Sequence, residues 1–235
     1  GILGRSSHQP DLDQMKSLDI EPIELVVVTL YPFSETISDG SINIATATEY
    51  IDIGGPTMVR AAAKNFAHVC ILTDHEQYVD FARKMEENEG IPFEMRKDLA
   101  GAAFNHTAGY DAQIANYFNS LSNEAIPDQI NISLHKNHSL RYGENPHQSA
   151  GVYGVQHSIM DCFHGKQLSY NNYLYVDSGL NIIRDFIHEK PSCVIIKHTV
   201  PCGVAIADTL QAAYTKAFET DKVSPFGGIV VFNKE

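Results

Sequence analysis

Short runs of apolar residues, alternating with stretches of helical pattern, limit the fold of this chain more than any other feature. Residues 25–30 form a β-branched run that predicts a buried parallel strand, and Tyr31-Pro32-Phe33 ends it because proline cannot continue a central ladder. Similar patterns predict strands at residues 69–73, 193–196 and 228–232, and helices at residues 11–18, 58–65, 99–121 and 210–218. Strands that alternate with helices predict an α/β protein with a mostly parallel sheet.

A change of pattern near residue 128 predicts two domains. Residues 122–127 form a largely polar stretch, and residues 130–134 alternate apolar with polar side chains, which predicts a strand that opens a second unit. We therefore place the first domain at residues 1–128 and the second at residues 129–235. The chain begins with Gly1 and stops just after a predicted strand, so we expect it to be an internal fragment of a longer protein.

The composition excludes several classes of protein. A formal net charge of −12 leaves no basic surplus to neutralise phosphates, so we expect no nucleic-acid partner. The four cysteines include no CxxC pair, which argues against a structural zinc site and a disulfide scaffold and favours reduced thiols in a cytoplasmic protein. No apolar run reaches the roughly 18 residues that span a membrane, and no secretory signal is visible.

A cation and an imidazole follow the predicted buried strand at residues 193–196. Lys197 and His198 stand at its end, before a turn that contains Pro201 and Gly203. Open α/β sheets bind ligands at such strand ends. Histidine can take up a proton near neutral pH, and lysine can hold an anionic or electron-rich group. The alternative is an ordinary surface turn.

The same turn permits a direct test for a zinc deaminase. Those enzymes use H-x-E followed by P-C-x-x-C. Here Val200 occupies the position of the glutamate and Ala205 that of the second cysteine. Both the proton shuttle and the metal-ligand set are incomplete, so we reject this class and predict no catalytic metal.

The segment Gly54-Gly55-Pro56 at a predicted helix start is a candidate anion site. Glycines let a ligand approach the backbone, and free N–H groups at a helix N-terminus attract phosphate, although a plain tight turn is the alternative. Lys64 lies in the same predicted helix, and a solvated basic face is its alternative role. We hypothesise that Tyr31, Asp52 and Lys64 converge on one substrate pocket.

A second polar segment, residues 140–148, is dense in side chains that recognise polar ligands. Its Arg141 can clamp a phosphate through two parallel hydrogen bonds. The alternative is a polar loop in which arginine and glutamate merely pair.

Six blocks together resemble one family. They are residues 31–33, 50–65, 140–148, 165–173, 197–203 and 224–228, and they occur in the family's order from end to end of the chain. The chain is similar to the bifunctional purine biosynthesis proteins, which combine AICAR (phosphoribosylaminoimidazolecarboxamide) formyltransferase with IMP cyclohydrolase.

The resemblance implies a fold and a function. Residues 1–128 would be an IMP cyclohydrolase domain of methylglyoxal-synthase-like fold that lacks its N-terminal segment. Residues 129–235 would be the first part of a cytidine-deaminase-like AICAR formyltransferase domain. The enzyme would be a one-carbon transferase and a cyclic amidine hydrolase, with 10-formyltetrahydrofolate as co-substrate, AICAR and formyl-AICAR as substrates, and no metal. It would be a cytoplasmic homodimer with formyltransferase sites between subunits.

The resemblance also implies roles for single residues. Tyr31, Asp52 and Lys64 match cyclohydrolase positions, and Lys197 and His198 match the formyltransferase pair. Substrate contacts are implied for Gly54, Gly55, Arg141, Tyr142, Asn172, Phe226 and Gly227. Two residues depart from the family pattern, Thr29 where asparagine is usual and Tyr175 where an acid is common.

The alternative function is a non-catalytic nucleotide-binding module or degenerate paralogue. Such a protein would keep Gly54, Gly55 and Arg141 but lose the acid–base residues. The chain retains all five predicted catalytic residues, which argues against this alternative.

Overall fold

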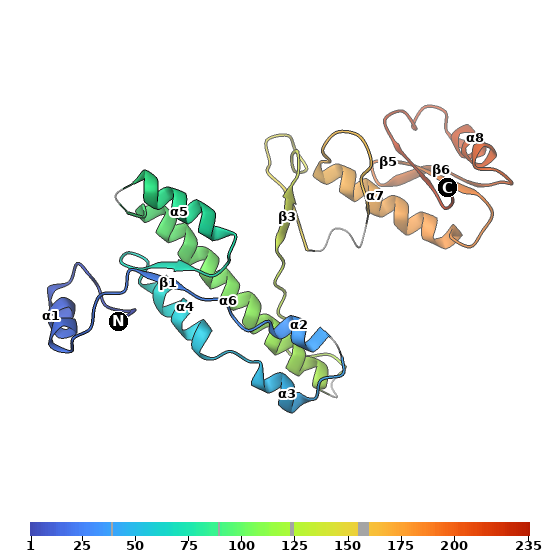
Figure 1. Cartoon of the computed structure of the whole chain (residues 1–235). Helices are drawn as coiled ribbons and strands as arrows, with labels where there is room; N and C mark the ends of the chain where they lie inside the picture. Colours follow the sequence, from blue (N-terminus) through green and yellow to red (C-terminus); the bar gives the residue numbers. More distant parts are fainter. Residues whose placement is uncertain (39, 89, 123–124, 155–159) are drawn as a thin grey trace. The chain divides into compact units, whose positions relative to one another are not determined.

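The chain divides into two compact units, Gly1–Ser133 and Leu134–Glu235. The computed structural model describes residues 1–38, 40–88, 90–122, 125–154 and 160–235 (Figure 1). Each unit combines helices with strands, so the predicted α/β class is confirmed at this level.

The first unit is rich in helices and has one small parallel sheet. Strand β1 (Leu25–Val27) pairs with β2 (Cys70–Leu72) in parallel, with Leu25 opposite Cys70. The helices are α1 (Gln9–Ser17), α2 (Phe33–Ser38), α3 (Ile44–Glu49), α4 (Gly54–Lys64), α5 (Gln77–Glu87) and α6 (Phe93–Leu121).

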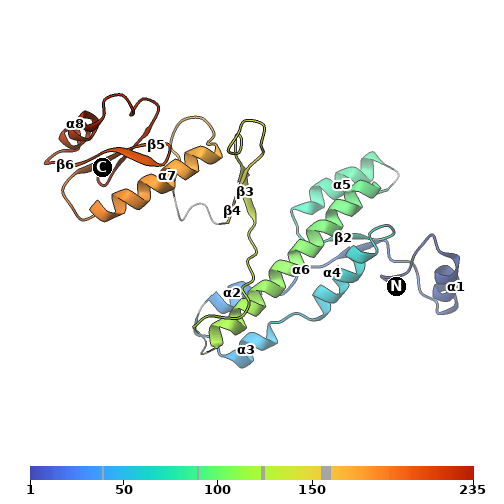
Figure 2. The same ribbon diagram turned by 180° about the vertical axis from the view of Figure 1, so that it is seen from behind.

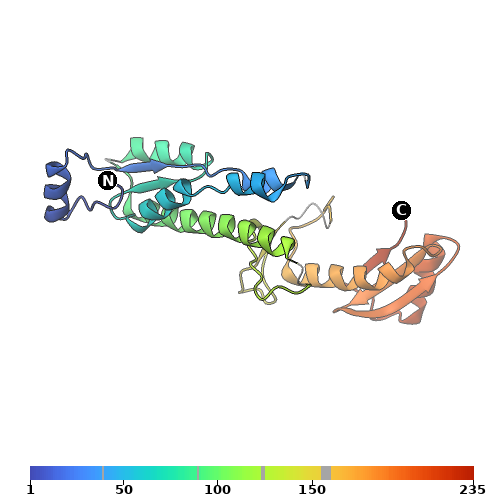
Figure 3. The ribbon, with the colours of Figure 1, turned by 90° about the horizontal axis from the view of Figure 1, so that it is seen from below.

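Alternate side chains of β2 build two hydrophobic clusters in this unit. Ile71 packs with Val59 of α4 and Ala103 of α6. Cys70 and Leu72 point the other way and join the cluster that contains residues of α5 and the start of α6. Helices α4 and α5 therefore cover opposite faces of the two strands, as Figure 3 shows.

The second unit has an antiparallel hairpin and a three-stranded antiparallel sheet. The hairpin joins β3 (Lys136–Ser139) to β4 (Gly151–Tyr153), and the sheet has the order β6-β5-β7. The elements after the hairpin are α7 (Tyr170–Ile183), the 3₁₀ turn η2 (Arg184–Phe186), β5 (Ser192–Lys197), β6 (Val200–Ile206), α8 (Leu210–Thr220) and β7 (Ile229–Phe232).

Strand β5 is the centre of this unit. Its side chains alternate between two clusters, because Cys193 and Ile195 pack with residues of α8 while Val194 and Ile196 pack with residues of α7. The sheet thus lies between α7 and α8 (Figure 2). Helix α8 approaches β6 so closely that a Cβ atom on Gly203 would collide with the carbonyl of Ala217.

Three expectations about strands are wrong. Residues 130–134 are not a strand: Ile130, Ile132 and Leu134 are 67%, 76% and 57% exposed, and the hairpin strand begins only at Lys136. The predicted strand at residues 25–30 ends at Val27. The strand that ends at Lys197 is antiparallel to both neighbours, so Lys197 leads into a hairpin turn that starts with His198, rather than lying at the edge of a parallel sheet.

The remaining predicted elements agree with the structure. Helices α1, α4, α6 and α8 and strands β2, β5 and β7 lie where the pattern predicts them, although α4 begins four and α6 six residues before the predicted start. Part of the predicted boundary, residues 123–124, lies outside the described residues. Across the described ranges, no helix is both long and apolar enough to cross a membrane.

Candidate active site

Asp52 stabilises the start of α4. Its carboxylate accepts a hydrogen bond of 2.8 Å from the backbone N–H of Gly55, which is one of the donors that a helix N-terminus leaves without an intrahelical partner. Gly55 has no room for a side chain, because a Cβ atom would lie 2.7 Å from Cδ2 of Leu30 and also meet the Asp52 carboxylate. The predicted anion site at Gly55 therefore holds the chain's own carboxylate.

Tyr110 of α6 fixes the backbone on the other side of Asp52. Its hydroxyl accepts a hydrogen bond of 2.8 Å from the N–H of Asp52 and donates one of 3.3 Å to the carbonyl of Tyr50. Burial raises the pKa of the Tyr110 phenol, and the Asp52 carboxylate raises it further. The phenol is therefore a neutral hydrogen-bonding group at physiological pH.

Tyr31 belongs to the same neighbourhood. It lies near enough to Tyr110 to raise the pKa of the Tyr110 phenol, and its own ring is 54% exposed. Phe33, two residues later, is 1% exposed and packs edge-on against Tyr110, with ring centroids 6.4 Å apart. The structure therefore places Asp52 against the buried Tyr110, with Tyr31 in the same neighbourhood.

Lys64 lies elsewhere in this unit. It is the last residue of α4, and ten residue steps of α-helix separate it from Gly54, a distance of about 15 Å along the axis. Asp52 precedes the helix, so the two predicted catalytic residues are at opposite ends of α4. The predicted convergence of Tyr31, Asp52 and Lys64 on one pocket is not seen within the described part of this unit.

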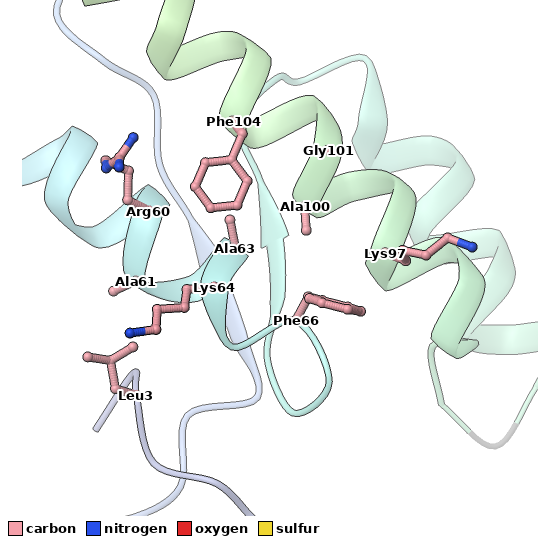
Figure 4. Close-up of a pocket in the computed structure, with 10 residues that line it drawn as sticks. All are labelled: Leu3, Arg60, Ala61, Ala63, Lys64, Phe66, Lys97, Ala100, Gly101 and Phe104. Carbon is pink, nitrogen blue, oxygen red and sulfur yellow. The ribbon is translucent and has the colours of Figure 1, made fainter.

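A cavity of about 590 Å³ surrounds Lys64 instead. It is lined by three cationic side chains, Arg60, Lys64 and Lys97, over an apolar floor from α4 and α6 (Figure 4). The Arg60 guanidinium lies 5.7 Å from the centre of the Phe104 ring, and Lys97 forms an ion pair with Glu94. Arg60 and Lys64 lie four residues apart in α4 and therefore share one helix face at this cavity.

In the second unit, Lys197 ends β5 and its ammonium group donates a hydrogen bond to the carbonyl of Phe226. Gly227 follows with φ 70°, a left-handed conformation that favours glycine, and a Cβ there would lie 3.3 Å from the Lys197 nitrogen. The structure therefore brings Lys197, Phe226 and Gly227 together. Phe226 and Gly227, predicted as nucleotide contacts, lie beside the lysine.

His198 and Thr199 form the turn between β5 and β6. Both have positive φ angles, 48° and 67°, which is uncommon for residues other than glycine and unfavourable for a β-branched threonine. Such conformations cost about 1–3 kcal/mol each and persist where the surrounding structure enforces them, often at functional sites. The turn presents an exposed imidazole directly after the buried strand.

Tyr175 of α7 contacts this imidazole. Its hydroxyl lies 3.0 Å from Nδ1 of His198, and the two rings meet edge-on with centroids 5.8 Å apart. The sequence marks Tyr175 only as a departure from the family pattern. The structure shows which residue it touches.

Arg141 and Tyr142 lie in the loop before α7. The Arg141 guanidinium stacks over the Tyr142 ring at 4.8 Å and donates to its hydroxyl at 3.2 Å. Arg141 also lines a polar cavity of about 680 Å³ together with Lys136 and His147. This cavity therefore contains cationic side chains of the kind that bind phosphate in other proteins.

Asn172 has a structural role that the sequence did not predict. Its side-chain oxygen accepts hydrogen bonds from the backbone N–H and the hydroxyl of Ser169, at 2.9 and 3.0 Å, in a capping box that starts α7. The adjacent Asn171 donates to the carbonyl of Glu144 at 3.0 Å. The start of α7 is thus joined to the Arg141 loop.

Two residues of the site were missed by sequence reasoning, Tyr110 and Tyr175. Tyr110 falls on the buried face of a predicted helix, with Ala103 and Thr107 at helical spacing, so its burial was predictable but its contact with Asp52 was not. Tyr175 lies 23 residues before His198, and no local pattern signals that pairing. Within the described ranges, no group of three or more His, Cys, Asp or Glu side chains is arranged to hold a metal ion.

Comparisons with known proteins identify relatives of the whole chain. A family model described as AICARFT/IMPCHase bienzyme matches residues 62–235. The bifunctional purine biosynthesis protein PurH of Rippkaea orientalis is 46% identical over 243 residues, which cover 100% of this chain and 47% of that protein. PurH of Listeria innocua is 42% identical over 241 residues, with the same shares. The chain spans about half the length of the curated relatives it matches.

One solved structure is also similar. It is titled "Crystal structure of ForH" and is 35% identical, with a TM-score of 0.44, covering 51% of this chain and 61% of that one.

Proposed function

Because the chain belongs to the AICARFT/IMPCHase bienzyme family, we propose that the protein catalyses the last two steps of IMP synthesis. In the first, the formyl group of 10-formyltetrahydrofolate moves to the 5-amino group of AICAR. In the second, formyl-AICAR closes its ring with loss of water to give IMP. The family match over residues 62–235 is the observation that carries this proposal.

We assign formyl transfer to Lys197 and His198. The amine of AICAR attacks the formyl carbon, a new C–N bond forms, and tetrahydrofolate leaves with the proton that the amine loses. That aromatic amine is a weak nucleophile, so removing its proton during the attack lowers the barrier. The exposed imidazole of His198 takes the proton, and the Lys197 ammonium stabilises the charge that develops on the formyl oxygen.

We assign ring closure to Tyr31, Asp52 and Lys64. The carboxamide nitrogen attacks the formyl carbon, and one water leaves. Tyr31 and Asp52 handle the proton transfers at the start of α4, where the N–H of Asp52 pairs with the Tyr110 hydroxyl. Lys64, at the far end of α4, lines a cavity together with Arg60. Its separation from Asp52 supports a charge-stabilising or substrate-binding role on another part of the substrate.

We assign residues 1–128 to a cyclohydrolase domain of methylglyoxal-synthase-like fold and residues 129–235 to a formyltransferase domain of cytidine-deaminase-like fold. The division of the chain at Ser133 supports two domains. The family supports a folate co-substrate, a homodimer and a cytoplasmic location, and no metal enters either step as we write it.

The test measures the two half-reactions separately in the protein that carries this chain. Ultraviolet absorbance follows AICAR with 10-formyltetrahydrofolate, and supplied formyl-AICAR tests ring closure alone. We expect His198→Ala to slow formyl transfer about 10²–10⁴-fold while ring closure stays within about twofold. If both activities collapse together in a folded variant, the division of roles is wrong. If the wild-type protein binds AICAR but catalyses neither step, the non-catalytic nucleotide-binding module replaces this proposal.

A further inference from the structure

The Tyr175–His198 contact is built into the packing of the second unit. Gly179 lies one turn after Tyr175 on the same face of α7, and this face meets the sheet at close range. A Cβ atom on Gly179 would lie 2.7 Å from Cγ2 of Val231 and 3.2 Å from Cδ1 of Ile196. Because residues four apart share a helix face, Tyr175 lies over the end of β5, where His198 follows.

The hydrogen bond involves one specific nitrogen of the imidazole. Nδ1 faces the Tyr175 hydroxyl at 3.0 Å. A neutral imidazole carries its proton on either Nδ1 or Nε2, and the partner of one nitrogen selects the tautomer. A phenol can accept from Nδ1–H or donate to bare Nδ1. Only the first arrangement leaves Nε2 with a lone pair that can accept a proton from a substrate.

We propose that Tyr175 is a positioning residue that holds His198 as the Nδ1–H tautomer, with Nε2 as the proton acceptor. Nδ1–H donates to the phenol oxygen in the neutral ring and in the imidazolium, so His198 gains and loses its proton at Nε2 without turning. The strained turn at His198 and Thr199 restricts the backbone conformation of His198, and the contact with Tyr175 restricts the orientation of its imidazole ring. This inference rests on the proposed role of His198 in formyl transfer.

The same helix provides a matched control. Tyr173, two residues earlier on α7, also contacts a histidine through its hydroxyl, which lies 3.2 Å from Nε2 of His138. The Tyr173→Phe and Tyr175→Phe variants each remove one hydroxyl from one tyrosine–histidine pair and keep the ring. A general effect of losing such a pair on α7 would appear in both variants.

The experiment combines ring-nitrogen NMR of ¹⁵N-histidine-labelled protein with formyl-transfer kinetics. In the wild type we expect the His198 signals of the Nδ1–H tautomer, assigned by their loss in His198→Ala. In Tyr175→Phe we expect a shift toward Nε2–H and a kcat for formyl transfer about tenfold lower, with KM for AICAR within about twofold. Tyr173→Phe should change neither the His198 signals nor kcat.

Three results overturn the inference: a wild-type Nε2–H tautomer, a Tyr175→Phe variant with unchanged His198 signals, or a changed tautomer with unchanged kcat. Failure of the proposed function is distinguishable, because it appears as formyl transfer that survives in His198→Ala. The NMR signals need no turnover, so they still decide whether Tyr175 sets the tautomer.

Discussion

The two units hold their predicted catalytic residues in opposite ways. In the first, Asp52 is tied into the fold, since its carboxylate stabilises the start of α4 and its backbone N–H pairs with the buried Tyr110. In the second, His198 stands on an exposed turn, and its imidazole contacts only a side chain, through the hydroxyl of Tyr175, among the hydrogen bonds described for it. Stability and chemistry are therefore coupled at Asp52 and largely separate at His198, a difference that substitutions can test.

The largest expected effect concerns Lys64, which is exposed although it belongs to the first unit. We expect Lys64→Ala to slow ring closure about 10²–10⁴-fold and to spare formyl transfer, so that formyl-AICAR accumulates. Lys97→Ala is the control, because Lys97 lines the same cavity but pairs with Glu94. An unchanged yield of IMP from formyl-AICAR in Lys64→Ala would leave Lys64 as part of a solvated basic face.

The next largest effect concerns the hydrophobic cores, where we expect similar losses of stability in the two units. Ile71 and Ile195 are 1% and 0% exposed, each in the main strand of its own unit. We expect Ile71→Ala and Ile195→Ala each to lower the free energy of unfolding by about 2–5 kcal/mol. Hydrogen exchange read peptide by peptide should place each loss in the unit that carries the substitution. A loss spread equally over both units would show that they do not unfold independently.

Alanine substitutions at two glycines should change stability by smaller amounts and in opposite directions. In Gly203→Ala the new Cβ meets the backbone of Ala217, and overpacking of this kind costs about 1–3 kcal/mol. Gly101→Ala is the matched change in the first unit, on α6 with nothing within 4 Å of the added atom, and should raise stability by about 1 kcal/mol. Denaturant titration checks both. Equal effects on the two glycines would contradict the close approach of α8 to β6.

The smallest effect tests the contrast between Asp52 and His198 directly. Asp52→Ala removes the hydrogen bond at the start of α4, and we expect a loss of about 1 kcal/mol. His198→Ala removes an exposed side chain, and we expect a change within about 0.5 kcal/mol. Thermal unfolding of the two variants measures the difference. If His198→Ala destabilises as much as Asp52→Ala, the second site is not separate from the fold.

The sequence predicts the elements whose pattern is set locally. The run at residues 193–196 becomes the fully buried centre of β5, and Gly54-Gly55-Pro56 starts α4 as expected from glycine and proline at a helix N-terminus. Residues 130–134 have the alternation of a strand but remain exposed, because a strand also needs a partner and the hairpin instead pairs Ser139 with Gly151. Local pattern does not contain that information.

The candidate site likewise has a part that local sequence predicts and a part that depends on how the helices pack. Lys197 and His198 are recognisable as a pair because they adjoin the buried strand in the sequence. The contacts of Tyr110 with Asp52 and of Tyr175 with His198 join residues 58 and 23 positions apart, and each depends on how a helix packs. The same holds for the separation of Asp52 from Lys64, which follows from the straight course of α4 between them.

The left-handed conformation of Thr199 has a consequence for protein engineering. A screen for heat resistance favours glycine at a strained, β-branched position with φ 67°, because glycine adopts that conformation without a steric penalty. Such a variant would score well in every stability assay while loosening the turn that carries His198. A library built on this chain should therefore keep residue 199 fixed, or sort its members by formyl transfer before it sorts them by melting temperature.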